Sequence, residues 1–246
     1  MLISIGTTHP WNIAGVGLDA RVAAEYGVAH GTCVVAVSAQ DSRGLHALQP
    51  IDPQAISAQL AALGEPQAIR VGALVSSDAV RIVAGYVRER AAEIPVVVDP
   101  VLSASLGGEL AADDALETTL AETLLALPVI VTPNLNEAAE LLQTAEGDAQ
   151  SWAKTFVARG ARAALVKGGH GEGDPVDVLA DAAGVRTFTA PRLPGSMRGT
   201  GCTLAAALAC ELLAGRDLDA AVARARDYVR AKIAARTMRG GMQVAF

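Results

Sequence analysis

Residues 94–100 read IPVVVDP and residues 128–134 read PVIVTPN, two short apolar runs that each end in polar residues. Similar runs occur at 2–6, 32–39, 68–72 and 164–169. An apolar run without polar alternation is typical of a strand that is buried on both faces of a parallel sheet. These runs therefore predict the strands of one central sheet.

Helices are expected between these runs. Asp52-Pro53 supplies an N-cap followed by proline at the first helical position, and Gly64 is placed to end a helix that runs through about Leu63. Strand and helix then alternate, which predicts an α/β fold with a mainly parallel sheet covered by helices on both faces. The segments 176–181 and 185–191 predict an antiparallel hairpin at one edge. Further helices are expected at 14–26, 77–91, 113–126, 135–144, 150–159, 202–214 and 218–237.

Composition limits the classes of function. The 246 residues carry a net charge of -6 with 3% aromatic residues, which argues against a nucleic-acid surface and for a small-molecule partner. No linker or repeat divides the chain, so we expect a single domain over residues 1–246. No apolar run approaches a membrane span and the first residues lack a signal-peptide pattern, so we expect a cytoplasmic protein. The three scattered cysteines argue against a disulfide framework.

The segment RGTGCTLAAALA at 198–209 places two glycines and a cysteine before a helix-forming run. Gly199 and Gly201 allow a tight loop, and the following N–H groups then point at one spot near the positive end of the helix dipole. This predicts an anion hole, although a structural turn has the same spacing. Cys202 lies in the first helical turn, where the dipole favours a thiolate that accepts a proton from an attacking hydroxyl. The alternative for Cys202 is a small, inert core residue.

Oxygen-bearing side chains follow two successive strands. Asp99, Asn134 and Glu137 suit Mg²⁺ held largely through water. Each also has a purely structural reading, since Asp99-Pro100 is compatible with a turn and Asn134 with Glu137 resembles a capping box. Lys167 ends a strand before Gly168 and Gly169, where it either reaches a phosphate or lies at the surface.

In this order and spacing, the motifs VDPVL, TPNLNEAAEL, VKGGH and GTGCTLAAALA resemble the ribokinase superfamily. Cysteine in the last motif, together with VAVSAQDSRG at 35–44, is similar to the hydroxymethylpyrimidine and phosphomethylpyrimidine kinases of thiamine biosynthesis. The resemblance implies a three-layer α/β/α fold and transfer of the γ-phosphoryl group of ATP to a hydroxymethyl group, and in many members to the resulting monophosphate. It also implies Mg²⁺, an aminopyrimidine substrate and a homodimer.

The resemblance assigns roles to individual residues. Cys202 would be the base, with Gly199 and Gly201 in the anion hole that stabilises the transferring phosphoryl group. Mg²⁺ would be organised by Asp99 and Glu137. The nucleotide would be bound by Asp99, Asn134, Glu137, Lys167, Gly168 and Thr200, and the acceptor by Asp19, Gln40 and Gly72.

Some positions depart from the family pattern. The family's GTDPSGGAG type loop is replaced by GTTHPWNIAG at 6–15, where Trp11 either stacks on a pyrimidine or fills its pocket. Arg198 replaces a frequent histidine and is able to bind phosphate or face solvent, and Ser105 replaces a frequent lysine. Residues 102–110 are a candidate lid. These departures keep a pyridoxal kinase and a non-catalytic ligand sensor of the same fold as alternatives.

Overall fold

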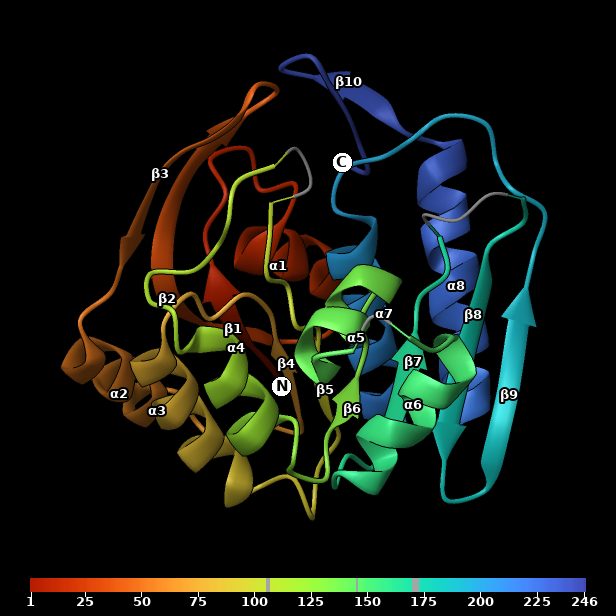
Figure 1. Cartoon of the computed structure of the whole chain (residues 1–246). Coiled ribbons are helices and arrows are strands. Elements are labelled where there is room, and N and C mark those ends of the chain that lie inside the picture. The colour runs from red at the N-terminus through yellow and green to blue at the C-terminus, as the bar shows by residue number, and fades with distance from the viewer. Residues whose placement is uncertain (105–106, 145, 170–172) are drawn as a thin grey trace.

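A nine-stranded sheet forms the centre of the computed structural model, which describes residues 1–104, 107–144, 146–169 and 173–246 (Figure 1). Its strand order is β3-β2-β1-β4-β5-β6-β7-β8-β9. The core pairs from β2 to β7 are parallel, whereas β3, β8 and β9 pair antiparallel with their neighbours. The strands are β1 Leu2–Thr7, β2 His30–Asp41, β3 Gly44–Pro50, β4 Ala68–Val71, β5 Val96–Val98, β6 Ile130–Val131, β7 Ala163–Val166, β8 Val176–Asp181 and β9 Gly184–Thr189.

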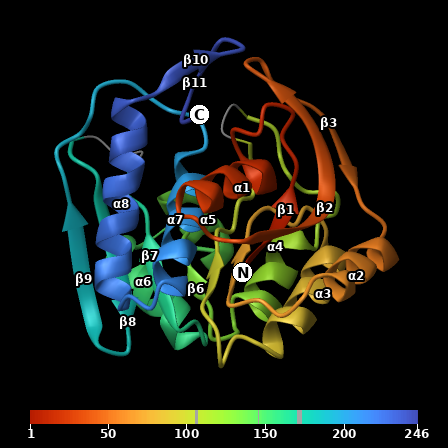
Figure 2. The ribbon, with the colours of Figure 1, turned by 180° about the vertical axis from the view of Figure 1, so that it is seen from behind.

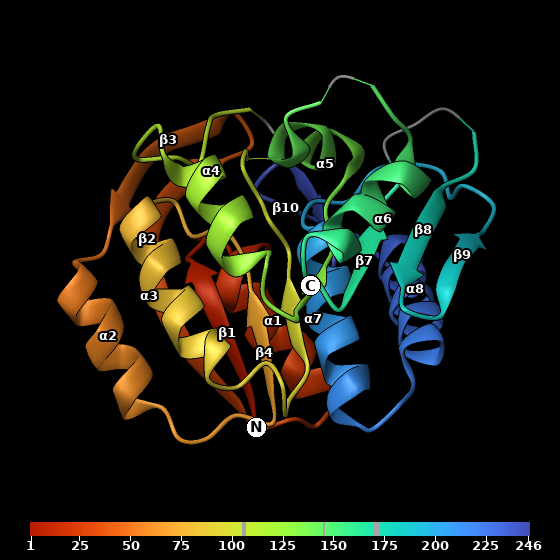
Figure 3. The ribbon, with the colours of Figure 1, turned by 60° about the horizontal axis from the view of Figure 1, so that its bottom comes forward.

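Helices cover both faces of this sheet, which confirms the predicted three-layer α/β/α architecture. One face carries α2 Pro53–Ala62, α3 Ser77–Arg88, α4 Leu116–Thr119, α5 Leu135–Leu142 and α6 Ala149–Ala158, together with the π-helical turn η1 Leu120–Leu124. Figures 1 and 3 show α2, α3 and α4 along one half of this layer and α5 with α6 along the other. The opposite face carries α1 Gly15–Glu25, α7 Thr200–Leu213 and α8 Leu218–Ala234, which lie in front in Figure 2.

The two faces of the sheet have separate apolar cores. Successive residues of β1 point to opposite faces, so Ile3 and Ile5 pack with one helical layer and Leu2 with the other. All six residues of β1 are buried, as the unbroken apolar pattern predicted. The predicted start of α2 is also confirmed, because the Asp52 side chain accepts hydrogen bonds from the N–H groups of Gln54 and Ala55.

Two hairpins were not predicted. β2 extends to Asp41 and turns back as β3, so VAVSAQDSRG belongs to a hairpin at the sheet edge. The helix expected to reach residue 237 ends at Ala234, and the chain continues as a hairpin of β10 Thr237–Arg239 and β11 Met242–Val244. Gly240 and Gly241 both have positive φ at its turn, a conformation that glycine adopts without strain. No helix within the described ranges is long and apolar enough to cross a membrane.

The α7 layer gives a test of the packing. Leu208, on α7, is fully buried in the apolar core of this face of the sheet. We expect Leu208→Ala to lower the free energy of unfolding by about 2 to 5 kcal/mol, because it removes transfer energy and leaves a cavity. Leu212→Ala, at a partly buried position on the same helix, is the matched control. Urea denaturation of both variants measures the difference, and equal losses would contradict this account of the core.

Candidate active site

The sequence-predicted residues converge at the carboxyl edge of the parallel strands, the upper edge in Figure 1. Asp99 follows β5, Asn134 follows β6 and Lys167 follows β7. The amino-terminal ends of α1 and α7 meet at the same edge, because a side chain on Gly199, the N-cap of α7, would collide with the Ile13 carbonyl and contact Leu18 of α1. This agrees with the rule that ligands of open α/β sheets bind outside the carboxyl ends of the strands.

A buried cluster of charges lies beneath this edge. Arg70, in β4, has no exposed surface, and its Nη1 lies 3.2 Å from Asp19 Oδ2 while its Nη2 lies 3.1 Å from Asp99 Oδ2. Lys167 Nζ lies 2.6 Å from the other Asp99 oxygen and 4.0 Å from Glu137 Oε2. Three carboxyl groups are thus paired with two cations, so electroneutrality is reached when one carboxyl holds a proton.

The pKa values of the three acids reflect this imbalance. Burial opposes ionisation of Asp99, but the cations of Lys167 and Arg70 hold its pKa below the usual range. Burial raises the pKa of Asp19 to about 6 despite Arg70. Burial also raises the pKa of Glu137 to about 7, against the attraction of Lys167 and with the repulsion of Asp99. Glu137 therefore titrates near neutral pH, and Asp99 is the carboxylate that stays ionised.

The glycine loop that was predicted to be an anion hole forms the first turn of α7. Gly199 is the N-cap with φ 76°, a left-handed conformation, and a side chain there would collide with the Ile13 carbonyl. Helix α7 begins at Thr200, two residues earlier than expected, so the N–H groups of Thr200, Gly201 and Cys202 belong to its first turn and have no intrahelical acceptor. A Cβ atom at Gly201 would lie 3.1 Å from Lys167 Nζ, so glycine keeps the loop close to the charge cluster.

The expected thiolate at Cys202 is not the resting state. Burial raises the pKa of this thiol, and the carboxylates of Asp99 and Asp19 add to the effect, whereas Arg70 and the Gly15 N–H oppose it. The helix dipole acts within about one turn, but here it is outweighed by desolvation and nearby negative charge. Cys202 is therefore a thiol at neutral pH, with contacts from Arg70 and Gly15 that stabilise its anion.

The residues that the resemblance assigns to the nucleotide have defined structural partners. Asn134 and Glu137 form the capping box of α5, with the Asn134 N–H 2.7 Å from Glu137 Oε2 and the Glu137 N–H 2.9 Å from Asn134 Oδ1. The Gly168 N–H donates to Asp177 Oδ1 at 2.9 Å. Lys167 is not the surface lysine of the alternative reading, since its ammonium group lies between two carboxyl groups.

A divalent cation has two candidate protein ligands in this cluster. Asp99 and Glu137 both face Lys167 Nζ, and the described part of the chain holds no group of three or more acidic, histidine or cysteine side chains spaced to bind a metal. Mg²⁺ usually keeps several waters and combines one or two carboxylates with substrate phosphates. The donor set therefore fits a cation that is held partly by phosphate oxygens and water.

The residues that the resemblance assigns to the acceptor lie at different depths. Gln40 is 9% exposed near the end of β2 and donates to Ser38 Oγ at 2.8 Å. Gly72 follows β4 directly above Arg70, and a side chain there would collide with the guanidinium group. Asp19 is fully buried on α1, where its carboxylate forms an ion pair with Arg70.

The divergent N-terminal loop packs against the end of the chain. Trp11 is 44% exposed and lies against Gly240 in the turn of the β10–β11 hairpin. Ile13 is buried in a small cluster with Met242 and Val244. Of the candidate lid, residues 102–104 and 107–110 are described and form a bridge between Ser103 and Glu109. Ser105 lies outside the described residues.

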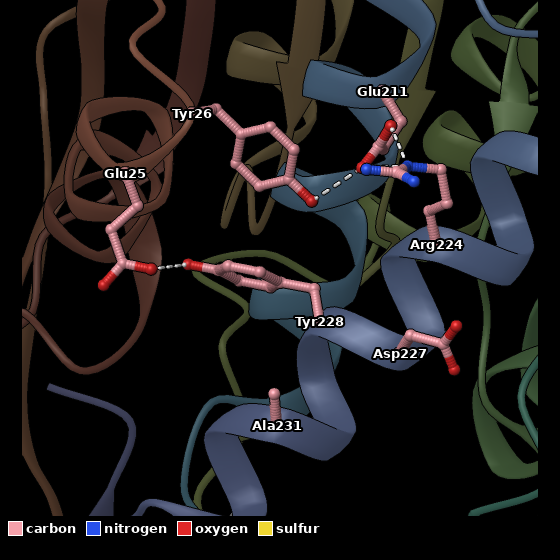
Figure 4. Close-up of a pocket in the computed structure, with 7 residues that line it drawn as sticks. All are labelled: Glu25, Tyr26, Glu211, Arg224, Asp227, Tyr228 and Ala231. Carbon is pink, nitrogen blue, oxygen red and sulfur yellow. Dashed lines mark hydrogen bonds and ion pairs between the residues drawn. The ribbon is translucent and has the colours of Figure 1, made fainter.

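A hollow of about 400 Å³ lies between the carboxyl-terminal ends of α1 and α7 and the middle of α8 (Figure 4). Glu211 is 3% exposed there and accepts from the Tyr26 hydroxyl and from Arg224. The Tyr228 hydroxyl donates to Glu25 at 2.8 Å. These bonds tie the three helices together, and no residue of the charge cluster lines this hollow.

Comparison with known proteins identifies the chain. A family model described as phosphomethylpyrimidine kinase matches residues 11–245. A hydroxymethylpyrimidine/phosphomethylpyrimidine kinase of Streptomyces coelicolor is 37% identical over 249 residues, which cover 98% of this chain and 91% of the relative.

Solved structures agree with this match. The phosphomethylpyrimidine kinase of Clostridium difficile 630 superposes with a TM-score of 0.82 at 23% identity, covering 94% of this chain and 98% of that one. The pyridoxal kinase of Bacillus subtilis, solved as an ADP complex, superposes with a TM-score of 0.87 at 25% identity, covering 99% and 96%. Fold and site together define a ribokinase-like kinase, and hence a phosphotransferase. More narrowly, the chain belongs to the phosphomethylpyrimidine kinase family.

Sequence reasoning missed Arg70, although a signal was present. The run AIRVG places one charged residue inside an apolar stretch that was itself predicted to be a strand buried on both faces. A buried cation needs buried partners, so this residue predicts carboxylates nearby.

Removal of Arg70 tests the charge cluster. Arg70→Met would leave Asp19 and Asp99 buried without this cation, and we expect a loss of about 3 to 5 kcal/mol in the free energy of unfolding at pH 8. The loss should be smaller at pH 5.5, because the Asp19 carboxyl, whose pKa is already raised, then takes up a proton. Urea denaturation at both pH values measures this, with Arg70→Lys as the charge-preserving control. A loss independent of pH would contradict the paired-carboxylate account.

Glu137 gives a second, pH-dependent test. Its pKa is about 7 in the fold and 4.5 for an ordinary glutamate, so folding favours the protonated acid and wild-type stability falls as pH rises from about 4.5 through 7. Glu137→Gln removes this loss, so we expect it to gain about 1 to 3 kcal/mol relative to wild type between pH 5 and pH 8. Glu89→Gln, at an exposed carboxylate, is the control. Parallel stability curves for wild type and Glu137→Gln would exclude the shift.

Proposed function

We propose that the protein transfers the γ-phosphoryl group of ATP to the hydroxymethyl group of 4-amino-5-hydroxymethyl-2-methylpyrimidine, to its monophosphate, or to both, in thiamine biosynthesis. The observation that carries this proposal is the convergence of Asp99, Glu137 and Lys167 beside the first turn of α7, where a Cβ atom at Gly201 would lie 3.1 Å from Lys167 Nζ. The family match supports the substrate, since the Streptomyces coelicolor relative is named for both pyrimidines.

In this mechanism the protein mainly positions groups and stabilises charge, as phosphoryl transfer requires. The unpaired N–H groups of Thr200, Gly201 and Cys202 donate to the oxygens of the transferring phosphoryl group. Lys167, held by Asp99 at 2.6 Å, adds a positive charge on the nucleotide side. Bound Mg²⁺ would supply further neutralisation of the triphosphate from the side of Asp99 and Glu137.

Cys202 accepts the proton of the attacking hydroxyl group in this proposal. A base of raised pKa is strong once ionised, but only a small fraction is ionised at neutral pH. Arg70 and the Gly15 N–H lower the pKa of the Cys202 thiol, so they stabilise its anion during proton transfer. In this proposal the Gln40 amide hydrogen-bonds the aminopyrimidine ring, and Gly72 is a further acceptor-side residue. We also expect a cytoplasmic homodimer.

A pH profile tests the role of Cys202. If its thiolate is the base, kcat/KM should rise about tenfold per pH unit below the pKa of the thiol, which lies above its ordinary value. Cys202→Ala should keep nucleotide binding and lose turnover together with this pH dependence. Cys210→Ala, at a buried cysteine on the same helix, is the control. Undiminished turnover in Cys202→Ala, or a flat profile in wild type, would reject the assignment.

Substrate assays decide among the alternatives. The protein with MgATP should form phosphorylated products from hydroxymethylpyrimidine or its monophosphate, followed as ADP release and product mass. Phosphorylation of pyridoxal alone would favour a pyridoxal kinase, a candidate supported by the TM-score of 0.87 to the Bacillus subtilis enzyme. Ligand binding without turnover would favour a sensor of the same fold.

A further inference from the structure

Two buried nitrogen atoms beside the anion hole have no hydrogen-bond partner among the described residues: Nε2 of His9 and Nη1 of Arg198. His9 is 2% exposed and lies in the divergent loop that follows β1. Arg198 immediately precedes the anion-hole loop. Such atoms are rare in folded proteins, because a buried donor that loses water and gains no acceptor is destabilising.

The hydrogen bonding of His9 shows that its free nitrogen is a donor. The Trp11 backbone N–H donates to His9 Nδ1 at 3.1 Å, so Nδ1 carries a lone pair and the ring proton lies on Nε2. Burial and the Arg198 charge lower the pKa of His9 to about 4, which agrees with a neutral ring at physiological pH. His9 Nε2 is therefore an N–H group without an acceptor.

Arg198 is held in place next to Cys202. Its backbone N–H donates to the Gln243 carbonyl at 2.8 Å, and the following Gly199 packs against the Ile13 carbonyl. The guanidinium group is close enough to His9 to help lower its pKa, and it also interacts electrostatically with Cys202. Both unpaired donors therefore belong to the region between the divergent loop and the start of α7.

Both residues are also departures from the family motifs. When Pro10 is matched to the proline of GTDPSGGAG, His9 stands where that motif has aspartate, so a donor replaces an acceptor. Arg198 stands where histidine is frequent, which adds a permanent cation. Both changes add hydrogen-bond donors to this region. They therefore favour a ligand group that only accepts hydrogen bonds.

We propose that His9 Nε2–H and the Arg198 guanidinium group form a subsite for an oxyanion carried by the acceptor, namely the phosphate monoester of a phosphorylated hydroxymethyl compound. A phosphate offers several acceptor oxygens and negative charge, which match one neutral and one cationic donor. Its place beside Cys202 puts this phosphate next to the anion hole. The inference rests on the proposed function and deepens it, because the subsite favours the monophosphate over the free alcohol.

Binding measurements on three variants of the full chain test this subsite. His9→Asn keeps an acceptor near the Trp11 N–H but removes the distal N–H, and Arg198→Gln removes the charge. Arg81→Gln removes an exposed arginine on α3 and is the matched control. Calorimetric titration should show the monophosphate binding about 10- to 100-fold more weakly to Arg198→Gln and several-fold more weakly to His9→Asn. The unphosphorylated alcohol should lose far less, and Arg81→Gln should bind both as wild type does.

The ratio of the two affinities is the deciding quantity. Equal weakening of the alcohol and its monophosphate would overturn the proposal. Weakening confined to a non-hydrolysable ATP analogue would also overturn it, because the donors would then serve the nucleotide. Neither variant should lower the Tm by more than a few degrees, since His9 Nε2 and Arg198 Nη1 have no partner among the described residues. If Arg198→Gln fails to fold, Arg198→Lys keeps the charge without the planar guanidinium group and should show an intermediate ratio.

Failure of the proposed function is separable from failure of the subsite. If neither pyrimidine is turned over, the substrate assignment fails, and inorganic phosphate becomes the probe. Phosphate binding to wild type that is lost in His9→Asn and Arg198→Gln, but kept in Arg81→Gln, would retain the subsite. Equal phosphate binding by all four proteins would reject it.

Discussion

The buried guanidinium group of Arg70 is the constraint on which the site depends. It joins Asp19 on α1 to Asp99 after β5, and its contact with Cys202 reaches the start of α7. One side chain thus fixes three segments that are distant in sequence. Because a buried charge is stable only when it is paired, strand β4, both helices and the β5 terminus have to keep this relative arrangement. Two glycines make this arrangement possible, because neither carries a side chain. Gly72 leaves room for the guanidinium group, and Gly201 leaves room for the Lys167 ammonium group.

Much of the fold was predictable because its strands are buried on both faces and therefore read as unbroken apolar runs. β1 and β4 are fully buried, and α2 begins at the Asp52-Pro53 signal. The missed hairpins have a different origin. β3 has a mixed burial pattern at the sheet edge, so it lacks the continuous apolar signature, and β10 is exposed along its length. The π-helical turn after Thr119 likewise has no sequence signal in LETTLAETLL.

At the site, sequence reasoning located residues better than it assigned their charge. The ends of β5, β6 and β7 were predicted to meet, and Lys167 does join Asp99 and Glu137. The expected thiolate at Cys202 was wrong. Its position at a helix start indicates a lowered pKa, whereas burial and the surrounding carboxylates raise the pKa of this thiol. Such a balance depends on distances between segments that are far apart in the chain. It is a property of the assembled cluster and of no single motif.

The C-terminal hairpin gives the divergent loop a structural partner. Ile13 is buried by Met242 and Val244, Trp11 lies on Gly240, and Arg198 is anchored to Gln243. The first and last segments of the chain therefore form one wall of the site. A chimera that received only a glycine-rich loop from a relative would uncover the apolar side chains of β11, and one that received only a new C-terminus would leave Ile13 and Trp11 without support. A substitution in the N-terminal loop therefore requires a compensating change in the C-terminal hairpin, and the reverse also holds. The two segments can be exchanged between relatives only together.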